Sequence, residues 1–124
     1  MEEGDEEFLP LEPLAVKNVS VNVNAAGTAL AADPDVLHMG TGRFQRIEWT
    51  IETAGWVFPT FRAGIQLKQY DDDLTNGSVD PSNRTVFRMN NANRRRRDLP
   101  YTVRVVKADG SVTLELDPTI KNQA

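Results

Sequence analysis

The chain has 124 residues, of which 40% are hydrophobic and 26% charged, and it contains no cysteine. A chain of this length can bury a core as one domain, and the absence of cysteine excludes disulfides, thiolate metal sites and cysteine nucleophiles. The formal net charge of −4 is unevenly spread, because residues 1–13 hold six acids and no base. The remaining residues hold 14 basic and 12 acidic side chains. This nearly neutral body argues against a broad nucleic-acid-binding surface.

The composition divides the chain into an acidic tail and one domain. Residues 1–13 carry the six acids and prolines at positions 10 and 13, which predicts disorder. Residues 14–124 are predicted to form the folded domain. The first residues have neither the basic nor the apolar region of a signal peptide, and no run approaches 18 apolar residues. We therefore expect a cytoplasmic protein with no membrane segment.

Period-2 alternation begins directly after the tail, and three predicted strands follow one another. Residues 19–24 (VSVNVN) place valine on one face and polar residues on the other. After a turn, residues 29–39 are expected to form a strand bent at Asp33-Pro34. Residues 44–53 alternate again, with Ile47, Trp49 and Ile51 directed inward.

The second half of the chain continues this pattern. Residues 56–59, 63–69 and 84–89 are predicted strands, and the Asp-, Asn- and Gly-rich residues 71–83 between them predict a long loop. Residues 101–116 form two alternating runs around Asp109-Gly110, which predicts a hairpin with a two-residue type I′ turn. This register sets Val105 opposite Leu114 and Val103 opposite Leu116.

These elements predict an all-β fold of seven or eight short antiparallel strands, because no window shows a sustained helical pattern. Turn signals every 8–12 residues are typical of a sandwich or a small barrel. The sequence also resembles immunoglobulin domains in two places. Trp49, with apolar neighbours two residues to either side, resembles the core tryptophan of strand C. The segment DLPYTV resembles the tyrosine corner of strand F, with Tyr101 as the tyrosine and Val103 in place of the second cysteine. The resemblance implies an immunoglobulin-like β-sandwich.

A narrower resemblance covers residues 16–122. The segments ADPDV, IEWTIETAGWVF and VTLELDPTIKN are similar to those of small bacterial proteins called the DP-EP family. That resemblance implies a bacterial protein with a single β-sandwich domain and no assigned activity. It supplies no catalytic residues.

The most conspicuous polar motif is the run of four arginines, Arg94, Arg95, Arg96 and Arg97. The run is interpreted first as a solvent-exposed loop that enters the 101–116 hairpin. A dock for an acidic partner is the second interpretation, and the nearest acids are those of the chain's own tail or of a neighbouring subunit's tail. A phosphate-binding site is the least favoured, since four arginines alone give weak affinity.

Three other groups could carry chemistry. Asp71, Asp72 and Asp73 offer the oxygen ligands that calcium prefers, but the EF-hand template fails, so a solvated loop is expected. Trp56 and Phe61 would form a stacking platform if exposed, although core positions are favoured. His38, the only histidine, could join carboxylates in a metal-dependent hydrolase.

Neither a nucleophile motif nor a nucleotide-binding fingerprint is present. The sequence therefore predicts a non-enzymatic binding or interaction module without cofactor or metal, for another protein or a second copy of the chain. The alternative is a carbohydrate-binding module that uses exposed Trp56 and Phe61. The candidate binding residues are thus Arg94, Arg95, Arg96, Arg97, Trp56 and Phe61.

Overall fold

The computed structural model describes residues 15–123, and in that range the chain forms eleven β-strands and no helix. The predicted acidic tail lies outside the described residues. The strands are β1 (Val16–Val23), β2 (Leu30–Asp33), β3 (Val36–His38), β4 (Gln45–Ile51), β5 (Trp56–Val57), β6 (Ile65–Leu67), β7 (Leu74–Asp80), β8 (Asn83–Asn91), β9 (Arg97–Lys107), β10 (Thr113–Leu116) and β11 (Thr119–Asn122).

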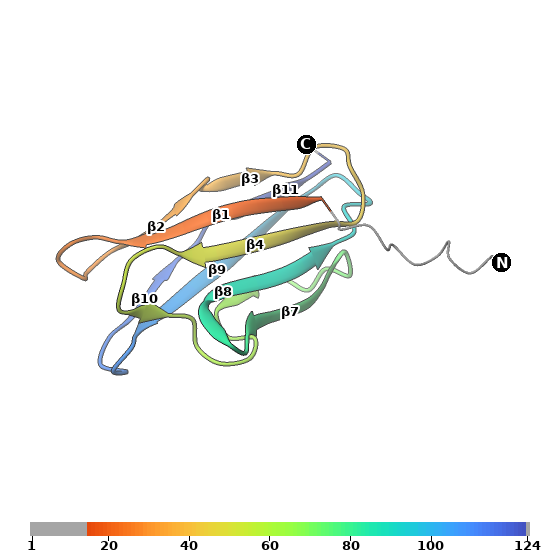
Figure 1. Cartoon of the computed structure of the whole chain (residues 1–124). Helices are drawn as coiled ribbons and strands as arrows, with labels where there is room; N and C mark the ends of the chain where they lie inside the picture. The colour runs from red at the N-terminus through yellow and green to blue at the C-terminus, as the bar shows by residue number, and fades with distance from the viewer. Residues whose placement is uncertain (1–14, 124) are drawn as a thin grey trace.

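The strands form two sheets rather than a closed barrel (Figure 1). The first sheet has the order β2-β1-β4-β8-β7. The second has the order β10-β9-β11-β3, and β5 and β6 also pair with β9. The predicted all-β class is therefore confirmed. The predicted number of strands is too small, because the 29–39 strand is divided at its bend and the sequence did not reveal β7 and β11.

The expectation of purely antiparallel pairing is wrong, since β1 pairs with β4 and β3 pairs with β11 in parallel. A bend at Asp33-Pro34 separates β2 from β3. It carries the chain from β2 in the first sheet to β3 in the second without reversing its direction. The chain consequently returns to the end where β1 began, and β4 starts beside the start of β1.

The core lies between the sheets and follows the predicted alternation. Ile47, Trp49 and Ile51 of β4 are buried, as predicted. On β9, the buried residues are Leu99, Tyr101, Val103 and Val105. Because successive strand residues point to opposite faces, each strand supplies alternate side chains to a common apolar layer.

Trp49 and Tyr101 join the two sheets at the centre of this layer. Both side chains are fully buried, and the indole N–H of Trp49 donates to the hydroxyl oxygen of Tyr101 at 3.0 Å. Their rings meet edge to face at 5.6 Å between centroids, and Phe87 packs against Trp49 at 6.0 Å. Burial raises the pKa of Tyr101 to about 12, so its hydroxyl stays protonated. The predicted tyrosine corner is wrong, because within residues 15–123 this hydroxyl pairs with Trp49 rather than with nearby backbone.

The 101–116 hairpin has the predicted register but not the predicted turn. Val105 pairs with Leu114 and Val103 with Leu116, as expected. Only Gly110 of the two central residues has a positive φ, 81°, whereas a type I′ turn requires it at both. The N–H of Lys107 donates to the carbonyl of Val112 and that of Gly110 donates to the carbonyl of Lys107, so residues 108–111 form a four-residue loop.

The prediction of a loop over residues 71–83 is wrong, because Leu74–Asp80 forms β7 at the edge of the first sheet. The register shifts by one residue between Thr75 and Ser78, and Asn76 adopts a φ of 59°. This bulge brings Leu74 and Val79, five residues apart, to the same buried face. The same irregularity hides the alternation in the sequence.

Candidate functional site: an arginine-rich loop end

One end of the molecule collects segments that are rich in polar side chains. At this end β4, β7 and β9 begin and β8 and β11 finish (Figure 1). The connecting segments are residues 39–44, 68–73 and 92–96. We call these segments, together with residues 122–123, the arginine end.

The strand register explains why distant segments meet here. Leu74 pairs with Asn91, so the three aspartates before Leu74 lie beside the residues that follow Asn91. The backbone N–H of Ala92 donates to the carbonyl of Asp73 at 2.8 Å, and that of Phe44 donates to the carbonyl of Ala92 at 3.1 Å. The connection between β8 and β9 is therefore held on both sides.

All the buried polar residues of the described chain lie in the arginine end or directly beside it. They are Gln45, Asp71, Asp73, Asn91, Asn93 and Asn122. Buried polar groups are costly unless they are hydrogen-bonded, so such a concentration needs a network of partners.

Asparagine amides supply much of that network. Asn91 and Asn122 exchange hydrogen bonds between their side chains at 2.7 and 3.1 Å. The side-chain nitrogen of Asn93 donates to the carbonyls of Gly40 and Gly42 at 3.0 and 2.7 Å. Its side-chain oxygen accepts the backbone N–H of Gln123 at 2.7 Å. These bonds tie the 39–44 and 92–96 segments to β8 and to the C-terminal residues 122–123.

Arginines of the run pair with the aspartates of the neighbouring segment. Arg94 Nε donates to Asp73 Oδ1 at 2.7 Å, and its backbone N–H donates to Asp73 Oδ2 at 3.0 Å. Arg95 reaches Asp72 Oδ1 at 2.8 Å. Two residues later, Nη1 of Arg97 donates to Asp71 Oδ2 at 2.7 Å. Three arginines therefore neutralise three carboxylates within the same domain.

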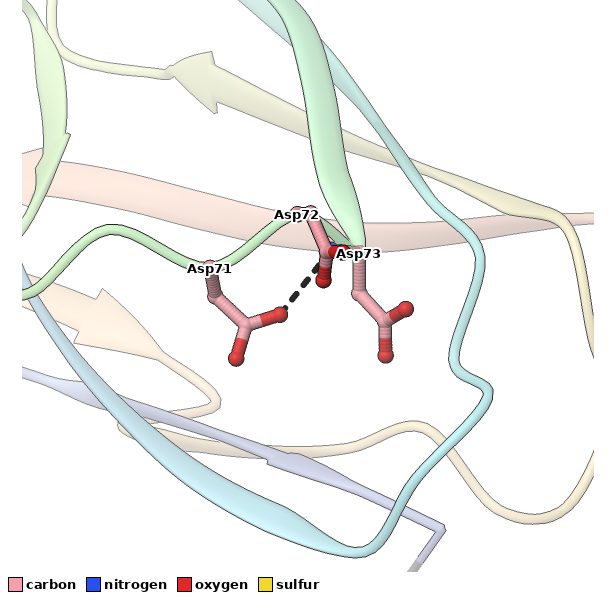
Figure 2. A group of neighbouring side chains, drawn as sticks. All are labelled: Asp71, Asp72 and Asp73. Atoms are coloured by element: carbon pink, nitrogen blue, oxygen red, sulfur yellow. Dashed lines mark hydrogen bonds between the residues drawn. The ribbon is translucent and has the colours of Figure 1, made fainter.

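The two sides of these ion pairs differ in exposure. The side chains of Asp71 and Asp73 are 1% and 0% exposed, whereas that of Asp72 is 55% exposed. Figure 2 shows the carboxylates of Asp71 and Asp73 directed into the bend of the β8–β9 connection. The arginine side chains stay about half exposed, at 44%, 53% and 48% for Arg94, Arg95 and Arg97. The acids are thus internal supports and the guanidinium groups form the surface.

The sequence-based interpretation of this region was right about the arginines and wrong about the acids. Arg94, Arg95, Arg96 and Arg97 are exposed, as predicted. The solvated loop expected for Asp71, Asp72 and Asp73 is wrong for the two buried members. Their partners are arginines 21 to 26 residues away, and a register that depends on the β7 bulge was needed to bring the two motifs together.

The aspartates do not form a convincing cation site. Their carboxylate oxygens lie within 4.8 Å of one another, and they are the only group of three metal-ligating side chains within residues 15–123. Arginine nitrogens already occupy an oxygen of each carboxylate. A metal ion would have to displace these guanidinium groups. His38 lies exposed on β3 and belongs to no such cluster of the described residues.

The predicted aromatic pair is split by the structure. Trp56 is 6% exposed and belongs to the core, so its role as an exposed platform residue is wrong. Phe61 is 80% exposed. Its carbonyl accepts the N–H of Val79 at 3.0 Å, near the end of β7 remote from the arginine end.

Two exposed aromatics of the arginine end were missed by the sequence analysis. Phe44 is 59% exposed and Tyr70 is 86% exposed. Phe44 lies an odd number of residues before the buried Ile47 and Trp49. The period-2 pattern therefore places its side chain on the opposite face of the strand, away from the core. Tyr70 adjoins a small pocket lined by residues 69–71 and 97–100.

Comparisons with known proteins do not identify the chain. No family model matches it, and no curated protein matches it. The resemblance to the DP-EP family therefore stays a prediction. Residues 15–123 contain no helix with the length and apolar character needed to cross a membrane.

We expect acid to weaken the fold through two aspartates. Burial raises the pKa of Asp73, but hydrogen bonds from Arg94 outweigh it and the pKa lies below 3.8. Hydrogen bonds from Ser82 and Arg88 lower the pKa of Asp80 to about 2. Because both pKa values are depressed in the folded state, their stabilisation is present above pH 4 and disappears as the pH falls toward 2. Urea titrations between about pH 6 and pH 2 measure this loss.

The variant Asp80→Asn provides the control for this prediction. It should show a smaller loss of unfolding free energy between about pH 4 and pH 2 than the unmodified chain. An identical loss in both proteins would contradict the assignment of Asp80.

Proposed function

We propose that the chain is a non-enzymatic protein-binding module with an immunoglobulin-like fold, and that the arginine end is its binding surface. The fold assignment rests on strand order. In the first sheet, β2, β4, β8 and β7 take the places of immunoglobulin strands A, B, E and D. In the second sheet, β5/β6, β9 and β10/β11 take the places of strands C, F and G, and β3 continues strand A. The strand β1 is then an addition between A and B. In this assignment Trp49 lies on strand B rather than on strand C.

The observation that carries the functional proposal is the rigid support beneath an exposed, arginine- and aromatic-rich surface. Arginine and tyrosine are enriched at protein interfaces, and they bind best when they are ordered before the partner arrives. The aspartates fix Arg94, Arg95 and Arg97, and Phe44 and Tyr70 lie in adjoining segments.

The charges of this surface favour an acidic protein partner. Arg43, Arg46 and Arg96 form no ion pair with another described residue. The guanidinium groups of the three paired arginines remain about half exposed. An acidic segment can therefore contact cationic groups here without first breaking the internal pairs. Self-association through this surface is a second form of the same proposal.

Strand-edge pairing has less support as a mode of association. The edge strand β7 carries a bulge, and its exposed residues are polar. Bulged polar edges discourage the addition of another strand. The carbohydrate alternative has less support as well, because Trp56 is buried in the core. Phe61 alone supplies only half of the expected stacking platform.

The proposal is tested with a fluorescent ten-residue polyglutamate peptide as the acidic probe. We expect it to bind at low salt and to weaken as salt is added, because exposed ion pairs are screened. The variant Arg96→Ser with Tyr70→Ser should reduce affinity about fivefold, which corresponds to roughly 1 kcal/mol. Fluorescence anisotropy measures the binding.

Phe61→Ser is the matched control, since it removes an exposed aromatic far from the arginine end. It should leave the affinity unchanged. An equal loss in the control, or tighter binding of duplex DNA than of polyglutamate, would reject an acidic protein as the partner. Sedimentation equilibrium of the chain alone distinguishes self-association from binding to another protein.

A further inference from the structure

We infer that the acidic N-terminal segment, residues 2–7, docks on the arginine end of its own chain and competes with the acidic partner. The competition rests on the proposed function, whereas the docking itself does not. The segment holds five acids, Glu2, Glu3, Asp5, Glu6 and Glu7, and no base. It lies outside the described residues, so the inference is argued from its point of attachment and its charge.

The attachment point lies at the arginine end. The carbonyl of Ala15 accepts the backbone N–H of Arg46 at 2.8 Å, and Val16 pairs with Arg46 at the start of β4. Arg46 in turn pairs with Asn90 near the end of β8. Since adjacent strands lie about 4.8 Å apart, the start of β1 is roughly 10 Å from the strand that leads into the arginine run. Figure 1 shows β1 and β4 starting together at this end.

The intervening chain is long enough for contact. Glu7 lies eight positions before Ala15, and an extended chain spans up to about 27 Å over eight such steps. The acidic segment can therefore reach across the arginine end without any change in the described strands. The opposite end of the molecule, with the 108–111 loop, is separated from Ala15 by the length of the strands.

Charge complementarity selects the surface on which the segment docks. Arg46 lies beside the attachment point at Ala15. Arg43 comes three residues before Arg46 in the chain, and Arg96 lies in the β8–β9 connection. None of the three forms an ion pair with another described residue. Tethering by a short linker gives an effective concentration on the order of millimolar, which makes an otherwise weak ionic contact significant. A partner that offers more contacts can still displace the segment.

A spin label at position 4 tests the docking directly. The chain has no cysteine, so Gly4→Cys provides a single attachment site. We expect strong broadening of the backbone amide signals of Arg43, Arg46 and Arg94–Arg97, and none in the 108–111 loop. The part of this broadening that depends on charge should disappear at about 1 M salt, where the Debye length is about 3 Å.

The matched control keeps the label and neutralises the five acids as Glu2→Gln, Glu3→Gln, Asp5→Asn, Glu6→Gln and Glu7→Gln. Its linker is the same, so any broadening caused by tethering alone persists. Equal broadening in the two proteins, or an excess over the control that survives about 1 M salt, overturns the docking.

Binding of polyglutamate then separates this inference from the proposed function. If both hold, the neutralised variant binds the peptide about fivefold more tightly than the unmodified chain at low salt. Peptide binding by both proteins without charge-dependent broadening rejects the docking and leaves the proposed function intact. Charge-dependent broadening in the unmodified chain, without peptide binding by the neutralised variant, rejects the acidic partner and leaves the docking intact.

Discussion

Replacing Trp49 with alanine is expected to lower the free energy of unfolding by about 4 kcal/mol. The indole is fully buried between the sheets and contacts both Phe87 and Tyr101 edge to face. Its removal leaves a cavity that the two rigid sheets cannot fill. For a domain of this size the melting temperature should fall by about 15 °C, as measured by circular dichroism.

Tyr101→Phe separates the hydrogen bond from the packing. This variant keeps the ring but leaves the buried indole N–H of Trp49 without its acceptor, which should cost about 1.5 kcal/mol. Val112→Ala, at a half-buried position beside the hairpin loop, serves as a comparison and should cost much less. A loss in Tyr101→Phe as large as that in Trp49→Ala would contradict this division.

Replacing Asp73 with alanine is the second large change, with an expected loss of about 2 kcal/mol in unfolding free energy. Asp73 is buried and accepts hydrogen bonds from the backbone and the guanidinium of Arg94. Removal of a buried partner is costly because the groups left behind lose their hydrogen bonds. The loss stays below that of a fully buried ion pair, since the Arg94 side chain is 44% exposed and can be rehydrated by water.

Asp72→Ala is the matched control for this second change. It removes the same charge from the neighbouring residue, but its side chain is 55% exposed and should contribute less than about 0.5 kcal/mol. Limited trypsin digestion adds a local measurement, because cleavage after Arg94–Arg97 requires the connection to open. Cleavage there should be much faster in Asp73→Ala than in Asp72→Ala. Equal rates would show that Asp73 does not hold the connection closed.

Regular alternation made much of the fold predictable. The buried faces of residues 19–24 and 44–53 follow directly from period-2 patterns, and the hairpin register follows from the position of Asp109-Gly110. The strand β7 could not be recognised, because its bulge places Leu74 and Val79 on one face although they are five residues apart. Parallel pairing was also invisible, since it depends on a bend at Pro34 that moves the chain between sheets.

The arginine end was predictable only in its parts. The sequence identified both the arginine run and the aspartate run, and it predicted the exposure of the arginines. It could not pair the two runs, because their contact depends on the register of β7 with β8. The burial of Asn91, Asn93 and Asn122 was equally hidden. Asparagine is usually exposed, and only tertiary contacts reveal that these three amides have partners.

The pairing of β3 with the C-terminal strand β11 affects the order in which the sheets form during synthesis. The strand β9 pairs with β5, β6, β10 and β11, and β11 in turn pairs with β3, which lies about 80 residues earlier in the chain. Contacts between such distant segments form slowly, since a long loop must close first. On the ribosome, β3 has no partner until the last strand has emerged. We therefore expect the second sheet to be completed only once β11 has left the exit tunnel, and a chaperone that covers β3 should raise the yield of folded protein.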